Sequence, residues 1–224
     1  MALVATPAQP SGTESVSRTP LGVLPATFVG VLPCADCTGI RCQLNLLPGG
    51  AYLQRTTYLR TGHDDSYYEL GKWSVSSDGA RLTLSDGRDD AVWAIRGART
   101  LRQLDRQGRP IDSKMPHELA RVPRPVPIEA RLRLEGAFRT MSDAPRFRDC
   151  RTAVEWPVAM TDDYLALERA YVARHDGLGS ELLVALEARL EMRSRLDGHG
   201  AAQTLVVEKF LRAMPGKTCK ERGE

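Results

Sequence analysis

Alternation of apolar and polar residues between positions 27 and 122 constrains the fold of this chain more than any other feature of its sequence. The stretch IRCQLNLL shows the pattern, because one face of an extended strand there carries Ile40, Cys42, Leu44 and Leu46. Turn signals such as Pro48-Gly49-Gly50 recur at intervals of about ten residues. The apolar spacing of three and four residues that a helix requires is absent. The pattern predicts an antiparallel meander closed into a small β-barrel, which we place at residues 20–122.

Three prolines at every second position, Pro123, Pro125 and Pro127, separate this region from the rest of the chain. Each proline fixes its own φ and favours an extended conformation in the residue before it. We interpret residues 123–127 as a stiff linker and place the domain boundary there. Residues 128–224 then form the second predicted domain.

The second domain has a different pattern of candidate strands and includes a helical segment. Its candidate strands are RLRLEGAFRT, RFRDCRT, EWPVAM, ELLVALEARLEM and TLVVEKFLRAM. A helical segment, TDDYLALERAYVARHD, lies between the third and the fourth, with Thr161 or Asp162 as its expected N-cap. Its expected apolar face consists of Tyr164, Leu165, Leu167, Tyr171 and Val172. Five strands with one helix between the third and fourth predict an OB-fold.

Composition limits the class of protein. Hydrophobic residues make up 42% and charged residues 26% of the chain, which is ordinary for globular proteins. The net charge is only +3 and neither part concentrates basic residues, so we expect no nucleic-acid partner. No stretch of 18 apolar residues predicts a transmembrane helix. Residues 1–19, rich in Pro, Ser, Thr and Ala, lack the features of a signal peptide and indicate a flexible tether. We expect that a targeting segment preceded them.

The segment VLPCADCTGIRCQ contains Cys34, Cys37 and Cys42. Three nearby thiolates suit Cu(I), which prefers soft ligands, so copper at these three residues is one interpretation. A zinc site would need a fourth ligand, and the sequence has neither a second Cys-x-x-Cys nor a His-x-x-x-His motif. A disulfide that ties down the loop is the alternative. Alternation with Ile40 and Leu44 predicts that the Cys42 thiol faces the barrel core and stays outside either arrangement.

Enzyme interpretations have little support. In thioredoxin-like oxidoreductases the Cys-x-x-Cys motif opens a helix after a strand, whereas a strand follows it here. The acidic pairs Asp64-Asp65, Asp89-Asp90 and Asp162-Asp163 fall in turns or at a helix start, where solvated caps are the usual role. We therefore predict a protein that is not an enzyme and that has no cofactor except, in the alternative above, copper.

Four segments together resemble one known family. They are VLPCADCTGI, LDRQGRPIDS, MSDAPRFRDCRTAVEWPVAM and LERAYVA, in this order along the chain. These segments resemble the NlpE lipoproteins, the envelope-stress and copper-resistance proteins of Gram-negative bacteria. The resemblance implies an N-terminal lipocalin-like barrel and a C-terminal OB-fold, with a lipid anchor at the periplasmic face of the outer membrane. It also implies signalling to a Cpx-type inner-membrane sensor kinase. The lipidated cysteine of the family is missing from this sequence, and Cys42 is an additional thiol.

A periplasmic location makes disulfide formation the default. Cys34 and Cys37 lie in one short loop, and Cys150 and Cys219 are the two cysteines of the second domain, so we expect these pairs and a free Cys42. In the chain-entropy model a loop of about 70 residues stabilises by roughly 4.4 kcal/mol and a loop of four by about 1.9. The four paired cysteines are therefore the candidate redox residues.

Two functions follow as expectations. The first is a two-domain sensor that reports envelope, surface-contact or redox and copper stress to a partner. The second is a periplasmic carrier or scavenger of copper or of a small lipophilic ligand. Eight strands within about 95 residues would leave only a narrow barrel interior for such a ligand.

Overall fold

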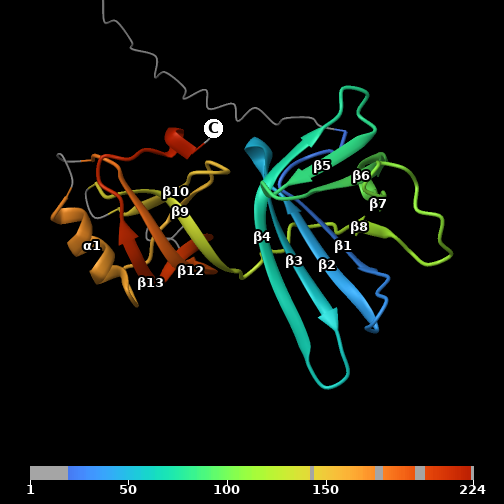
Figure 1. Cartoon of the computed structure of the whole chain (residues 1–224), viewed down its shortest axis with the longest axis horizontal. Helices are drawn as coiled ribbons and strands as arrows, with labels where there is room; N and C mark the ends of the chain where they lie inside the picture. The colour runs from blue at the N-terminus through green and yellow to red at the C-terminus, as the bar shows by residue number, and fades with distance from the viewer. Residues whose placement is uncertain (1–19, 142–143, 175–178, 195–199, 223–224) are drawn as a thin grey trace, which may run out of the picture.

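The computed structural model describes residues 20–141, 144–174, 179–194 and 200–222, and the expected tether at residues 1–19 lies outside the described residues. Two β-rich bodies lie side by side and are joined by one connection between β8 and β9 (Figure 1).

The first body is an eight-stranded antiparallel barrel. Its strands are β1 (Ala26–Leu32), β2 (Gly39–Leu46), β3 (Ala51–Leu59), β4 (Asp64–Val75), β5 (Arg81–Ser85), β6 (Asp90–Arg96), β7 (Thr100–Gln103) and β8 (Glu118–Arg121). Each strand pairs with the next along the chain, and β1 pairs with β8 through Phe28↔Arg121 and Val29↔Ala120. The predicted small closed barrel is confirmed.

Side chains fill the interior of this barrel. Alternate residues of its strands point inward because successive side chains of a strand lie on opposite faces. The buried cluster inside consists of Leu21, Ala26, Phe28, Leu32, Cys42, Leu44, Leu46, Tyr52, Leu82, Leu84, Trp93, Leu101 and Leu119. A phenylalanine, a tyrosine and a tryptophan among them occupy the space that an apolar ligand would need.

The second body is a five-stranded sheet with one helix. Its elements are β9 (Arg131–Arg139), β10 (Arg146–Asp149), β11 (Glu155–Pro157), α1 (Tyr164–Val172), β12 (Leu182–Ser194) and β13 (Ala201–Ala213). The strand order is β11-β10-β9-β12-β13, and a parallel bridge between Val158 and Leu205 brings the two edges together. This is the partly open barrel of an OB-fold, and the helix lies between the third and fourth strands as predicted.

The helix is shorter than its sequence pattern suggested. Asp163 occupies the N-cap position without a side-chain capping bond, in place of the expected Thr161 or Asp162, and its carboxylate accepts a hydrogen bond from the Phe210 backbone N–H at 2.7 Å. Leu165 and Val172 are 52% and 64% exposed, so the apolar face is narrower than expected. Only one side of this nine-residue helix is buried, and it consists of Tyr164, Leu167, Ala170 and Tyr171. Within the described parts of the chain, no helix has the length and apolar character needed to cross a membrane.

The proline-rich linker is fastened to the barrel. The Val126 N–H donates to Thr27 Oγ1 at 3.0 Å, and the Val126 carbonyl accepts from Gln43 Nε2 at 2.9 Å and Asn45 Nδ2 at 2.8 Å. Thr27 Oγ1 in turn donates to Asn45 Oδ1 at 2.8 Å. Thr27, Gln43 and Asn45 point away from the barrel core, yet they are buried beneath the linker. We call these three side chains and Val126 the linker clasp.

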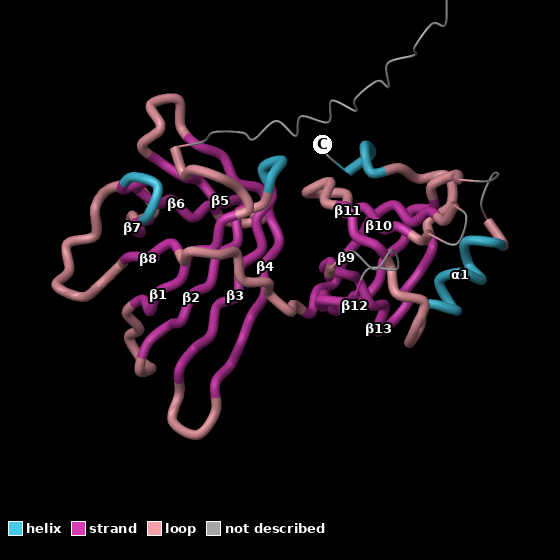
Figure 2. The backbone as a smooth tube through the Cα atoms, turned by 180° about the vertical axis from the view of Figure 1, so that it is seen from behind, coloured by secondary structure: helices cyan, strands magenta, loops and turns pink. Residues whose placement is uncertain are grey.

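The two bodies share apolar contacts. Leu53 on β3 and its cross-strand partner Leu70 on β4 lie on the outer face of the barrel, where they belong to the same buried cluster as Ile128, Ala130 and the OB-fold core. In both backbone views β4 is the barrel strand beside the second body (Figure 2). The apolar surface of each body is thus completed partly by the other.

Candidate functional site

The Cys-x-x-Cys motif lies in the loop that joins β1 to β2. The pairing of these strands ends at Leu32↔Ile40, which leaves residues 33–38 outside the ladder. Cys34 and Cys37 are half-buried and form a disulfide, with a Cα–Cα distance of 5.4 Å. The bond closes a sequence separation of only three residues, so its contribution to folding stability is small.

Asp36 adds a carboxylate to this loop. Its Oδ1 lies 3.4 Å from Cys34 Sγ, and one ligand atom from each of Cys34, Asp36 and Cys37 lies within 4.8 Å of the others. Reduction of the disulfide would leave two thiol groups and one carboxylate in this arrangement. The sequence interpretation named the cysteines but missed Asp36, although its position between them was a usable signal.

Cys42 is separated from this group. It lies on β2 with its side chain in the barrel core, where it is 1% exposed. Burial, reinforced by the negative charge of Glu69, raises the pKa of the Cys42 thiol to about 12. The described residues therefore form a Cys34–Asp36–Cys37 group rather than a cluster of three cysteines, and Cys42 is a neutral, inaccessible thiol.

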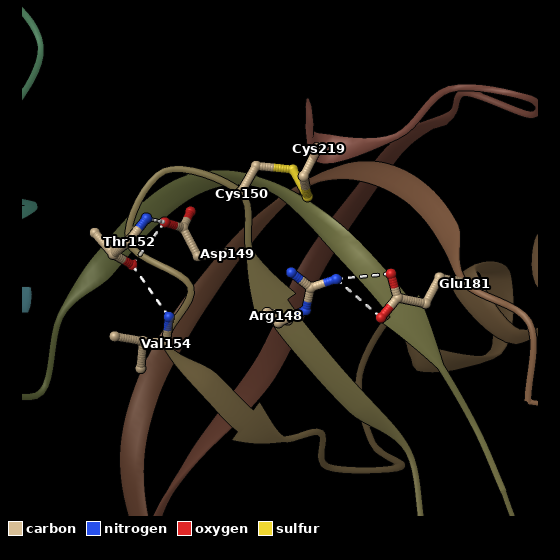
Figure 3. Close-up of a disulfide and its surroundings, with 7 residues drawn as sticks. All are labelled: Arg148, Asp149, Cys150, Thr152, Val154, Glu181 and Cys219. Atoms are coloured by element: carbon tan, nitrogen blue, oxygen red, sulfur yellow. Dashed lines mark hydrogen bonds and ion pairs between the residues drawn. A yellow bond between two sulfur atoms is a disulfide. The ribbon is translucent and has the colours of Figure 1, made fainter. Parts of the chain in front are cut away.

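Cys150 and Cys219 form the second disulfide, across a sequence separation of 69 residues and with a Cα–Cα distance of 5.0 Å. Cys150 directly follows β10, and Cys219 begins a short 3₁₀ turn, Cys219–Arg222, beyond the last strand (Figure 3). One side of the bond packs against a small apolar cluster made by Leu183, Ala185 and Met214. The disulfide thus fastens the segment after β13 to the OB-fold sheet.

The turn beside this disulfide is held by polar contacts (Figure 3). The buried Asp149 carboxylate accepts hydrogen bonds from Thr152 N and Thr152 Oγ1, both at 2.8 Å. Arg148 precedes Asp149 on β10, and its Nη2 donates hydrogen bonds to both Glu181 carboxylate oxygens, at 2.7 and 2.9 Å. Cys150 is therefore presented from a fixed turn.

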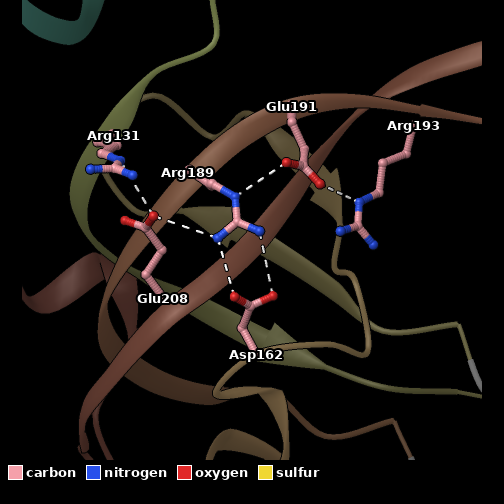
Figure 4. Close-up of polar contacts among 6 residues, drawn as sticks. All are labelled: Arg131, Asp162, Arg189, Glu191, Arg193 and Glu208. Atoms are coloured by element: carbon pink, nitrogen blue, oxygen red, sulfur yellow. Dashed lines mark hydrogen bonds and ion pairs between the residues drawn. The ribbon is translucent and has the colours of Figure 1, made fainter.

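A network of charged residues holds the segment that precedes the helix (Figure 4). The Arg189 guanidinium contacts both carboxylate oxygens of Asp162, at 3.3 and 3.4 Å, and also contacts Glu191 and Glu208. The hydrogen bond from Arg189 lowers the pKa of Asp162, and the one from Arg193 lowers the pKa of Glu191. These groups stay ionised and paired, so Asp162 has a structural role that its sequence pattern did not reveal.

Comparisons with known proteins support one family. The model of the NlpE N-terminal domain matches residues 28–114, and that of the NlpE C-terminal OB domain matches residues 129–220. Lipoprotein NlpE of Escherichia coli (strain K12) is 28% identical over 202 residues, which covers 90% of this chain and 83% of that protein.

Two solved structures are also similar in sequence. The crystal structure of the Cpx pathway activator NlpE from Escherichia coli is 27% identical, covers 88% of this chain and 99% of that chain, and has a TM-score of 0.38. That of a putative lipoprotein from Shewanella oneidensis is 29% identical, covers 45% and 90%, and has a TM-score of 0.39. The model of the N-terminal domain matches the barrel, and the model of the C-terminal OB domain matches the second body. The chain therefore belongs to the NlpE family.

Proposed function

We propose that this protein is a lipid-anchored signalling protein at the periplasmic face of the outer membrane, which activates a Cpx-type two-component system through its inner-membrane sensor kinase. Family membership supports this proposal, together with the E. coli relatives that are named a lipoprotein and a Cpx pathway activator. We propose the role of a sensor rather than that of an enzyme. A sensor needs two distinguishable states and a partner that reads them.

The Cys150–Cys219 bond is the observation that carries the redox part of the proposal. It joins the segment after β13 to the OB-fold sheet across 69 residues, and its loss would remove up to roughly 4 kcal/mol of stability. Small domains have only about 5–15 kcal/mol in total. Without this bond the segment after β13 is no longer fastened to the sheet, so it would detach more readily and expose new surface to a partner. Loss of Cys34–Cys37 would change stability little.

A stress-response reporter in cells tests the signalling role. When cells are treated with a thiol reductant, those that carry the lipidated full-length protein should give a higher reporter output than cells without any family member. Deletion of the sensor kinase should abolish the increase. An unchanged reporter at confirmed outer-membrane abundance would refute the proposal. An increase that survives deletion of the kinase would refute the proposed partner.

Copper binding is a second candidate function, and the Cys34–Asp36–Cys37 group is the observation that favours it. Two thiolates are soft ligands that suit Cu(I). After reduction, Cu(I) titration against a competing chelator should show binding that Cys34→Ala abolishes. Cys42→Ala, which changes a thiol inside the barrel, is the matched control and should leave binding unchanged. Equal affinity of parent and Cys34→Ala would exclude this site.

A further inference from the structure

A cleft between the barrel and the OB-fold opens onto the Cys150–Cys219 disulfide. Its volume is about 510 Å³, which would hold a small organic molecule. The barrel contributes Lys72 and Arg88 to its walls, and the OB-fold contributes Arg133, Glu135, Asp149, Arg151 and the two cysteines.

The carboxylates of the cleft are already engaged. Asp149 accepts two hydrogen bonds from Thr152, and Glu135 forms an ion pair with Arg212 at 3.6 Å. The two negative charges in the walls are therefore partly satisfied by groups other than the cations that line the cleft.

The cations of the cleft have fewer partners. Lys72 and Arg133 make no ion pair or side-chain hydrogen bond with any part of the chain that the structure describes. Arg151 donates to the backbone carbonyl of Asp86, which is a neutral acceptor. Arg88 pairs with the carboxylate of Asp86 at 3.6 Å. With four cations against two carboxylates, the cleft carries a net positive charge, and such clefts concentrate anions.

We propose that this cleft is a binding site for small anionic thiols, and that it selects them as reductants of the Cys150–Cys219 bond. The attacking species in disulfide exchange is a thiolate, and a molecule that also carries carboxylates would be held by the cations from both bodies. The same cations stabilise the cysteine thiolate that leaves.

The reaction balances in two steps. A first thiolate bonds to one cysteine sulfur, the Cys150–Cys219 bond breaks, and its electron pair remains on the other cysteine as a thiolate. A second thiolate then attacks the external sulfur of the mixed disulfide and releases the remaining cysteine thiolate. Two external thiols are oxidised to one disulfide, and the cysteine pair gains two electrons.

The Cys34–Cys37 disulfide provides an internal comparison. The Asp36 carboxylate lies 3.4 Å from Cys34 Sγ and repels an approaching anion. The same protein thus carries one disulfide beside cations and one beside an anion. Their preferences for charged thiols should be opposite.

Thiol selection would regulate the Cys150–Cys219 bond, and its physiological meaning rests on the proposed function. The selection itself is measured on the purified full-length protein. A negative result there would not affect the signalling test, and a negative signalling test would not affect the measured selection.

The experiment compares mercaptosuccinate, 2-mercaptoethanol and cysteamine, which are anionic, neutral and cationic. Each disulfide is followed by alkylation and peptide mass spectrometry, and each rate is divided by the thiolate concentration and by the rate with a neutral small-molecule disulfide. At low salt, mercaptosuccinate should reduce Cys150–Cys219 about tenfold faster than 2-mercaptoethanol does, cysteamine should be slowest, and added salt should remove the difference. For Cys34–Cys37 the order should be reversed, with cysteamine fastest and mercaptosuccinate slowest.

Charge variants locate the effect. Lys72→Gln and Arg133→Gln, one from each wall, should each lower the preference for mercaptosuccinate several-fold and leave the rate with 2-mercaptoethanol unchanged. Arg106→Gln, at an exposed arginine outside the cleft, is the matched control and should keep the parental preference. Equal normalised rates for the three thiols would overturn the proposal, as would a preference that survives in both cleft variants.

Discussion

The cysteines of this chain differ in chemistry because their surroundings differ. Cys42 is enclosed by the barrel core and keeps its proton, since burial disfavours the charged thiolate. Cys34 and Cys37 lie in a half-buried loop with a carboxylate between them. Cys150 and Cys219 lie at a cationic cleft. Residue type alone therefore does not distinguish the buried apolar thiol from the proposed metal ligands and the proposed redox pair.

The raised pKa of Cys42 predicts a pH dependence of stability. The thiol keeps its proton in the folded protein up to a pKa of about 12, whereas the unfolded chain loses it near pH 9. The folded state then binds more protons, so the free energy of unfolding should fall by up to about 1.4 kcal/mol per pH unit between these values. Urea denaturation at pH 8, 9 and 10, with disulfides checked by mass spectrometry, measures the slope.

Cys42→Ala is the control for this measurement. In this variant the decrease in unfolding free energy that begins near pH 9 should disappear. A decrease that begins near pH 10 should remain, because burial and the hydrogen bond to Glu69 also raise the pKa of Tyr52. Identical slopes in parent and variant between pH 8 and 10 would contradict the assignment to Cys42.

The linker behaves as part of the barrel. Its prolines keep it extended, but the linker clasp decides where it lies. Thr27, Gln43 and Asn45 bring polar groups to the outer face of β1 and β2, and the Val126 backbone satisfies them. Because buried polar groups are costly when unpaired, the clasp fixes the position of the linker and hence the entry into β9.

Thr27→Val tests the clasp. The substitution keeps the shape of the side chain but leaves the Val126 N–H and Asn45 Oδ1 without their hydroxyl partner, which should cost about 1–3 kcal/mol of unfolding free energy. Thr83→Val, at a half-buried barrel position, is the matched control and should change stability by less than about 0.5 kcal/mol. Similar denaturation midpoints for the two variants would contradict the role of the clasp.

The two bodies are coupled by apolar packing. Leu53 and Leu70 lie outside the barrel core and inside the cluster that includes the OB-fold core. Separation of the bodies would expose this surface to water, at a cost of roughly 25 cal/mol for each Å². We therefore expect the barrel and the OB-fold to unfold together.

Leu53→Asp should uncouple them. Hydrogen–deuterium exchange of peptides from β1–β8 and from β9–β13, measured against denaturant, should give one common transition in the parent and two in the variant. Val31→Asp makes the same kind of change at an exposed position of the barrel and should keep the common transition. Two transitions already present in the parent would show that the bodies are independent.

The sequence predicted what local patterns determine. Alternation placed Cys42, Leu44 and Leu46 on one face, and the strand order with a single helix indicated the OB-fold, because both depend on residues close in the chain. Contacts between distant segments were beyond it. In the sequence, Thr27 and Asn45 look like solvent-exposed strand residues, but the linker covers them in the structure. Lys72 and Arg133 line one cleft only because the two bodies pack against each other.

We propose that loss of the Cys150–Cys219 bond turns the protein into its signalling state. The most direct test is the stress reporter in cells that carry lipidated full-length variants at matched abundance. The double variant Cys150→Ala/Cys219→Ala should raise output well above the parent, because the OB-fold loses its long-range crosslink. Cys34→Ala/Cys37→Ala, which removes a bond across three residues, should stay close to the parent. Equal output from the parent and Cys150→Ala/Cys219→Ala would show that this bond does not control signalling.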